Sequence, residues 1–108
     1  MKLYINRNPV MEIDLANDSL TRMKGLMFVK NIQKGLLIKP TNSIHTFFMK
    51  EAIDVIYIDK YSKIIKITPN MKPWKIGPIV WSARAVLELP IGTINKYRIK
   101  TGDSVEFL

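Results

Sequence analysis

The chain has 108 residues, of which 47% are hydrophobic and 24% charged, a composition typical of one folded domain over residues 1–108 and not of a disordered segment. It contains no cysteine and one histidine, which excludes disulfides, thiolate metal sites, a cysteine nucleophile and multi-histidine metal centres. Its formal net charge of +8 favours anionic partners but does not specify a fold.

The first elements in chain order are two strands and a helix. Alternating apolar residues predict a hairpin of two short strands within residues 3–15, with a turn before Pro9. The period changes at Asp18, a typical helix N-cap, and apolar residues then recur at helical spacing. We therefore expect one short helix near residues 18–29. Gly25 is a poor helix former, which indicates that the backbone approaches a neighbour closely there.

The rest of the chain is dominated by β-branched and aromatic residues, which predict further short strands. These strands are expected over residues 35–39, 44–49, 53–59, 63–68, 82–89 and after residue 103. Prolines and a glycine make residues 70–78 a surface loop. The pattern predicts a mainly β, single-domain antiparallel β-sandwich or distorted barrel of seven or eight strands. We expect the core to include Leu26, Ile38, Phe48, Ile56, Ile58, Ile67, Val86, Leu87 and Val105.

The segment from Ser43 to Lys50 contains the single histidine. As a strand it would place His45, Phe47 and Met49 on one face and further apolar residues on the other, which is typical of a central, buried strand. Two interpretations of the histidine follow. We favour a hydrogen-bonded core histidine, and the alternative is a polar group on a pocket floor, with Phe47 and Met49 as the apolar wall.

Charged residues within apolar surroundings form a second group. Glu88 lies in an apolar strand, where a carboxylate is costly unless it is paired. Arg22 flanks the apolar stripe of the predicted helix, so we favour a structural ion pair between Arg22 and Glu88 over a catalytic carboxylate. Asp54 opens its strand and is either a site residue or an acceptor for backbone amides in a turn.

A basic segment without acids follows. Its cations are Lys60, Lys63, Lys66, Lys72, Lys75 and Arg84. We favour a solvated face, and the alternative is a track for single-stranded nucleic acid over residues 60–84, with Tyr61, Trp74 and Trp81 as stacking rings. The tryptophans are equally consistent with pinning the proline-rich loop onto the core. We expect at most weak nucleic-acid binding.

Five blocks in order resemble the family called domain of unknown function 192. They are RMKGLM at 22–27, SIHTFFMK at 43–50, IDVIYID at 53–59, AVLELPIGT at 85–93 and GD at 102–103. The resemblance implies a compact, mostly β domain with a short helix near its start and no established activity. Its characteristic positions map to Arg22, Gly25, Met27, Met49, Glu88 and Gly102, with no catalytic role attached. Members often carry an export or lipoprotein signal, from which the start of this chain departs.

The expected location and function follow from these observations. No apolar run approaches the roughly 18 residues of a membrane span and no signal peptide pattern is present, so we expect a cytoplasmic protein without a membrane partner. No Walker, GxGxxG, HExxH or GxSxG motif occurs, and we expect no metal, cofactor or assigned catalytic residue. We expect a non-enzymatic domain that binds a small polar or anionic ligand, or a protein, near Arg22, His45, Met49 and Asp54. The alternative is a small hydrolase or isomerase with His45 and Asp54 as acid and base.

Overall fold

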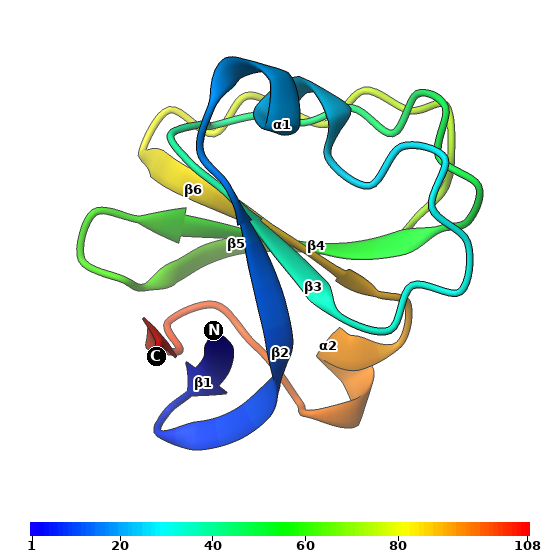
Figure 1. The fold of residues 1–108 in the computed structure, drawn as a ribbon. Helices are drawn as coiled ribbons and strands as arrows, with labels where there is room; N and C mark the ends of the chain where they lie inside the picture. The colour runs from blue at the N-terminus through cyan, green and yellow to red at the C-terminus, as the bar shows by residue number, and fades with distance from the viewer.

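The computed structural model describes all residues 1–108 as a mainly β single domain (Figure 1). Its elements are β1 (Lys2–Ile5), β2 (Asn8–Ala16), α1 (Ser19–Lys24), β3 (Gly35–Ile38), β4 (Ile53–Asp59), β5 (Ile64–Met71), β6 (Ala83–Pro90), α2 (Thr93–Lys96) and β7 (Val105–Phe107). Neither helix is long and apolar enough to cross a membrane.

The strands form one seven-stranded mixed sheet in the order β5-β4-β6-β3-β2-β1-β7, so the predicted antiparallel sandwich or barrel is wrong. The pair β2 and β3 is parallel, because α1 and the following loop carry the chain back to the sheet end where β2 began. The edge strands β5 and β7 meet at their first residues, through an isolated bridge between Lys63 and Ser104 and a few backbone hydrogen bonds beside it, and do not pair along their length. The sheet is therefore strongly curved but not closed (Figure 1).

Local signals in the first part of the chain produce the predicted structure, with one difference in length. Asn6 and Arg7 have φ of 50° and 69°, the left-handed values that a two-residue hairpin requires. Asp18 caps α1, its Oδ1 accepting the N–H of Thr21 at 2.8 Å. The helix ends at Lys24, earlier than residue 29, because Gly25 leaves helical geometry with φ 51° and ψ −131°.

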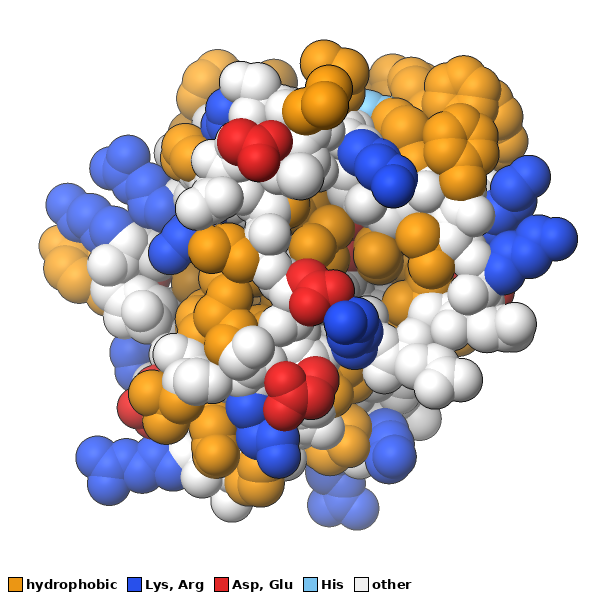
Figure 2. Space-filling view, viewed as in Figure 1, with side chains coloured by type: hydrophobic (Ala, Val, Ile, Leu, Met, Phe, Trp, Pro, Cys, Tyr) orange, Lys and Arg blue, Asp and Glu red, His pale blue; other side chains and the backbone are white.

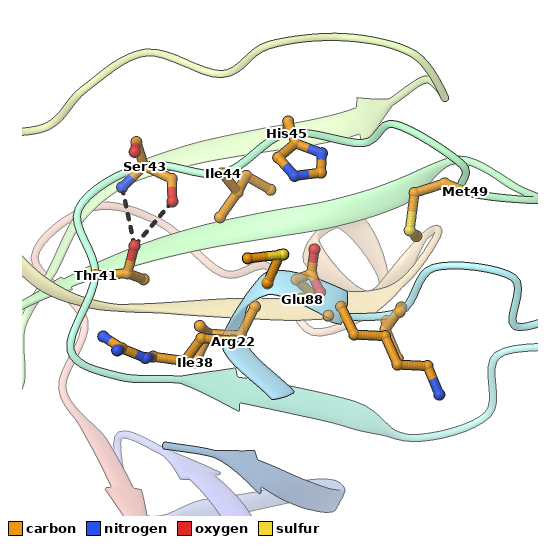
Figure 3. A pocket seen from close by; sticks show the side chains of 12 residues that line it. Arg22, Ile38, Thr41, Ser43, Ile44, His45, Met49 and Glu88 are labelled. Carbon is orange, nitrogen blue, oxygen red and sulfur yellow. Dashed lines mark hydrogen bonds between the residues drawn. The ribbon is translucent and has the colours of Figure 1, made fainter. Parts of the chain in front are cut away.

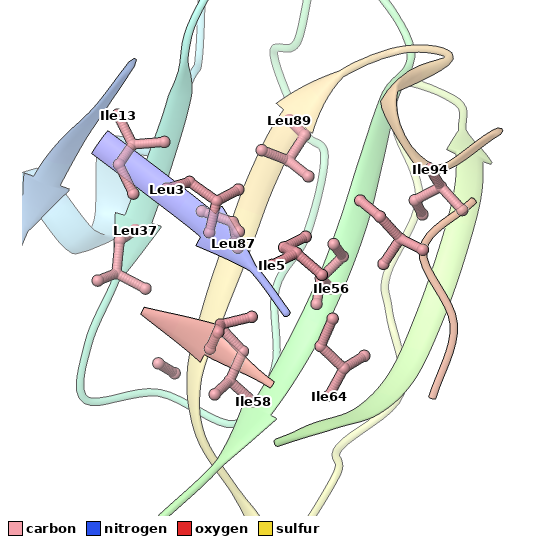
Figure 4. Close-up of a cluster of buried hydrophobic side chains, with 13 residues drawn as sticks. Leu3, Ile5, Ile13, Leu37, Ile56, Ile58, Ile64, Leu87, Leu89 and Ile94 are labelled. Atoms are coloured by element: carbon pink, nitrogen blue, oxygen red, sulfur yellow. The ribbon is translucent and has the colours of Figure 1, made fainter. Parts of the chain in front are cut away.

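The two faces of the sheet carry separate cores. The curved inner face packs a large aliphatic cluster that includes Ile56, Leu87 and Leu89, closed by β1, β7 and α2 (Figure 4). The opposite face is covered by α1 and by three loops, residues 25–34, 39–52 and 72–82. Of the predicted core, the buried residues are Ile38, Ile56, Ile58, Val86, Leu87 and Val105, while Leu26 and Ile67 are partly buried. Phe48 is 47% exposed, so its assignment to the core was wrong.

The predicted strand at residues 44–49 is also absent, and the segment is a loop with one isolated bridge from His45 to Ile76. The chain turns here because the amide of Met49 donates to the carbonyl of Thr46, and Phe48 adopts φ 62°. The buried Thr46 hydroxyl donates to Lys72 O at 2.6 Å and accepts the N–H of Lys75 at 2.9 Å. These bonds bind the loop to residues 72–82 instead of to the sheet.

Candidate functional site

A cavity of about 270 Å³ lies between α1, the 39–52 loop and the middle of the sheet (Figure 3). Its wall is formed by the helix and the turn after it, by the end of β3, and by the loop, and β6 contributes its floor. The lining residues are Arg22, Met23, Lys24, Gly25, Leu26, Ile38, Thr41, Ser43, Ile44, His45, Met49 and Glu88.

Glu88 supplies the buried ionisable group of this cavity. It lies on the central strand β6, opposite Leu36 of β3 and Val55 of β4, and is 2% exposed. Its Oε1 has no hydrogen-bond partner. Burial raises the pKa of Glu88 to about 7, while the backbone N–H of Leu26 acts to lower that pKa. The carboxyl group therefore exchanges between its neutral and ionised forms near neutral pH.

Gly25 closes the space above this carboxyl group. A Cβ at position 25 would lie 2.8 Å from Oε1 of Glu88, which is closer than real contacts allow. The glycine also has φ 51°, a conformation that side chains disfavour. The predicted close approach of the Gly25 backbone to a neighbour is confirmed, and the neighbour is the carboxyl group of Glu88.

The predicted ion pair between Arg22 and Glu88 is wrong. The ion pairs of the structure join the N-terminus to Glu12 and Lys34 to Asp14. Arg22 instead donates from Nε to Asp18 O at 3.2 Å and from Nη1 to Pro40 O at 2.9 Å. The guanidinium group points away from Glu88, toward the chain that follows β3, and forms no ion pair with the carboxylate (Figure 3).

His45 and Met49 line the cavity together with Arg22, so three of the four predicted ligand-binding residues lie around one space. His45 is half-buried, and its Nδ1 accepts the N–H of Phe47 at 3.1 Å. The neutral imidazole then carries its proton on Nε2. Phe47 does not line the cavity, because its ring packs against those of His45 and Trp74 at 4.9 and 5.9 Å between centroids.

Asp54 lies elsewhere. It pairs with Leu89 of β6, on the sheet face opposite to Glu88, and lines a different depression near α2. Its Oδ1 accepts the N–H of Asn70 at 2.9 Å and its Oδ2 accepts the N–H of Ile94 at 2.8 Å. Asp54 is therefore an acceptor for backbone amides, although these amides belong to β5 and α2 and not to a turn. An acid and base pair of His45 with Asp54 is wrong, because the two residues line different cavities.

Metal-binding side chains do not gather in the molecule. No three residues of the His, Cys, Asp and Glu types come together in a way that could hold an ion. The cavity supplies one carboxyl group and one imidazole, with hydroxyl groups from Thr41 and Ser43. The hydroxyl group of Thr41 is itself engaged, because Thr41 Oγ1 donates a hydrogen bond to the backbone carbonyl of Ser43 at 2.9 Å (Figure 3).

Sequence reasoning missed a cluster of aromatic rings beside the cavity, which we call the aromatic platform: the exposed Phe28, Phe48 and Trp74, and the half-buried Phe47. Trp74 and Trp81 are 59% and 82% exposed, so neither pins its loop to the core. The platform comes from three loops and has no periodicity in the sequence. Tyr61 lies at the opposite end of β5, roughly 25 Å along the strand, and cannot belong to it.

The six cations of the basic segment are likewise spread over separate parts of the fold, with Lys66 inside β5 and Arg84 on β6. Lys60 and Lys63 lie at the hairpin that joins β4 and β5, where Lys63 donates to Ser104 Oγ. Lys72 and Lys75 follow the other end of the strand. The six cations thus belong to separate regions and not to one compact patch.

Fold and site together define a curved mixed-sheet domain that holds a buried carboxyl group in a small cavity. The chain belongs to the DUF192 family, described as uncharacterized ACR, COG1430, which it matches over residues 2–107. It is 34% identical over 101 residues to a UPF0127 protein of Pyrococcus horikoshii, covering 89% of this chain and 87% of that one. A UPF0127 protein of Thermococcus kodakarensis is 30% identical over 89% of this chain, and the match spans 64% of its length.

Two solved structures share the fold. A protein of unknown function from Novosphingobium aromaticivorans has a TM-score of 0.81 and 26% identity, covering 90% of this chain and 75% of that chain. A structure titled as a putative transcription regulator from Sinorhizobium meliloti has a TM-score of 0.76 and 24% identity, over 87% of this chain and 79% of that one. The second likeness concerns the fold alone.

Proposed function

We propose that this domain binds a small polar molecule in the cavity and that Glu88 receives a hydrogen-bond donor of that molecule. The observation that carries the proposal is the Oε1 atom of Glu88, which is buried and unpartnered. A buried polar atom without a partner costs about 1–3 kcal/mol, so folded proteins rarely leave one without a reason. An N–H or O–H group of a ligand would remove this cost.

The other side chains of the cavity indicate the class of ligand. Arg22 and Lys24 on the helical wall provide positive charge, whereas the floor provides the carboxyl group of Glu88. Leu26 and Met49 add apolar surface to the lining of the cavity. The arrangement suits a molecule with an ammonium or hydroxyl donor at one end and an anionic group at the other, which is the chemistry of small amino acids.

The experiment is a thermal-shift screen of amino acids, amines and polyols, followed by calorimetry on each hit. A ligand that binds only the native state must raise the melting temperature. We expect Glu88→Gln to weaken binding at least roughly tenfold, because the amide replaces one acceptor with a donor. Glu12→Gln is the matched control, since the Glu12 side chain is 64% exposed on β2. Equal affinities in the wild type and Glu88→Gln would refute the proposal.

The pH dependence gives a second test. An ammonium ligand binds the ionised carboxylate, so binding below the raised pKa of Glu88 must release a proton from the protein. Calorimetry at pH 6 in two buffers of different ionisation enthalpy measures this proton. We expect proton release in the wild type and none in Glu88→Gln.

Acid–base catalysis is a second candidate, favoured by the pKa of about 7 at Glu88. Such a carboxyl group could move a proton on the bound molecule. The two functions predict different fates for the bound molecule in D₂O. A binding protein releases its ligand unchanged, whereas a proton-transfer catalyst exchanges carbon-bound hydrogen of the ligand for deuterium from the solvent. NMR of each hit in D₂O separates them.

A further inference from the structure

The aromatic platform is a second feature of the covered face, independent of the cavity ligand. Each of the three covering loops contributes one of its main rings, Phe28, Phe48 and Trp74, which are 58%, 47% and 59% exposed. Phe48 packs against Phe28 at 5.6 Å and against Trp74 at 4.8 Å between ring centroids. The rings therefore form one contiguous apolar surface that faces solvent.

The backbone beneath these rings is strained. Phe28, Phe48 and Trp74 have φ of 65°, 62° and 65°, a region that bulky side chains rarely adopt. Backbone bonds hold them there: Phe28 N–H donates to Phe48 O at 3.0 Å, and Trp74 N–H donates to Thr46 O at 2.9 Å. The rings at these strained positions stay 47–59% exposed, and none of them belongs to a buried hydrophobic cluster. Strain of this kind is typical of functional surfaces.

Lysines surround the platform. Lys30, Lys50, Lys72 and Lys75 are all exposed, lie within two residues of a platform ring, and form no ion pair. The one carboxylate of the three loops is Glu51, whose oxygens accept the amides of Asn31 and Ile32. In the space-filling view, apolar side chains gather beside the histidine, with cationic side chains around them (Figure 2).

We propose that the aromatic platform docks the domain onto an anionic membrane surface. Exposed rings enter the interfacial region of a bilayer, and lysines beside them are attracted to anionic headgroups. The 72–82 loop, which carries Trp74, also exposes the aliphatic side chains of Ile76 and Ile79, which are 76% and 54% exposed. Aliphatic side chains insert into lipid but do not stack on bases, and the platform rings already cover each other in part, which favours lipid over single-stranded nucleic acid.

The test is titration of the full chain with vesicles of phosphatidylcholine, with and without phosphatidylglycerol, followed by tryptophan fluorescence and co-sedimentation. Both tryptophans of the chain, Trp74 and Trp81, lie in the 72–82 loop, so the fluorescence reports on this face alone. We expect a blue shift and binding at least roughly tenfold tighter to the anionic vesicles, weakened by salt.

Two matched pairs of variants locate the contact. We expect the double change Lys72→Gln and Lys75→Gln to weaken vesicle binding, whereas Lys60→Gln with Lys63→Gln alters net charge equally at the far end of β5 and should leave it almost unchanged. Phe48→Asn should weaken binding roughly tenfold, and Tyr61→Asn, an exposed ring beside Lys60, should not. Asparagine tolerates left-handed φ, so Phe48→Asn should melt no lower than the wild type.

Three outcomes would overturn the proposal. Equal weakening of vesicle binding by the two double lysine variants would show that net charge, and not the position of the lysines, controls binding. Absence of a fluorescence shift on anionic vesicles would exclude insertion of the platform. Tight binding of a single-stranded oligonucleotide that quenches the tryptophans, without vesicle binding, would assign the surface to nucleic acid instead.

Discussion

The backbone of Gly25 closes directly over the carboxyl group of Glu88, so that a Cβ at position 25 would lie 2.8 Å from Oε1. The turn after α1 and strand β6, which are distant in the sequence, are therefore in direct contact at this point. The turn after α1 excludes water from the carboxyl group, and burial raises its pKa. The same turn lines the cavity, together with His45 and Met49.

Glu88→Gln should change the pH dependence of stability. The pKa of Glu88 is raised from 4.5 to about 7 in the folded protein, so the native state binds this proton more tightly than the unfolded state does. Its contribution to stability is therefore present at low pH and is lost as the pH rises from 4.5 through 7. Relative to the wild type, Glu88→Gln should gain about 3 kcal/mol of unfolding free energy between those limits. Urea unfolding of both proteins at pH 5 and pH 8 measures the change, and parallel pH profiles would contradict it.

Gly25→Ala should destabilise the fold by about 1–3 kcal/mol, because it adds both strain at positive φ and a collision with the carboxyl group. Gly102→Ala separates the two effects, since Gly102 has φ +93° but no atom within 4 Å of its would-be Cβ. The difference between the variants, from denaturant unfolding, reports the contact with Glu88. Equal losses of unfolding free energy in the two variants would show that the Glu88 side chain moves aside without a measurable cost in stability.

Asp54→Asn should lower stability by about 2 kcal/mol without affecting the cavity. The new amide group can accept from only one of the two backbone N–H groups, of Asn70 and Ile94, that the carboxylate now satisfies. Asp14→Asn makes the same chemical change at an exposed ion pair and should cost far less. Unfolding free energies and ligand affinity are both measured. A loss of ligand affinity in folded Asp54→Asn would contradict the assignment of this residue to the opposite face.

Asp18→Ala should remove the cap of α1 and produce a small loss of stability, less than that at Asp54. The hydrogen bond from Thr21 lowers the pKa of Asp18, so the contribution of the carboxylate is present above pH 3.8 and is lost as the pH falls through the lowered pKa. The wild type and Asp18→Ala should therefore converge in acid. The neighbouring exposed residue provides the control, because Asn17→Ala should leave the melting temperature unchanged.

The amino-acid pattern was enough to predict the elements whose signals are local. The hairpin turn, the cap at Asp18 and the buried strands β4 and β6 depend on hydrogen bonds and side-chain alternation within a few residues. The unusual glycine within the predicted helix also indicated a close approach, and the ordered blocks indicated the family. Three of the four predicted ligand-binding residues, Arg22, His45 and Met49, lie around the cavity.

Which of these elements meet became clear from the folded structure. The sequence could not show that Arg22 donates to Pro40 and leaves Glu88 unpartnered, or that Asp54 faces the other side of the sheet. Nor could it show that Phe48 is exposed, because its left-handed backbone is held by contacts between separate loops. The periodicity of apolar residues indicates the type of a single helix or strand. The order in which strands pair, the direction of β3 and the contacts between loops instead arise from packing between residues far apart in the chain.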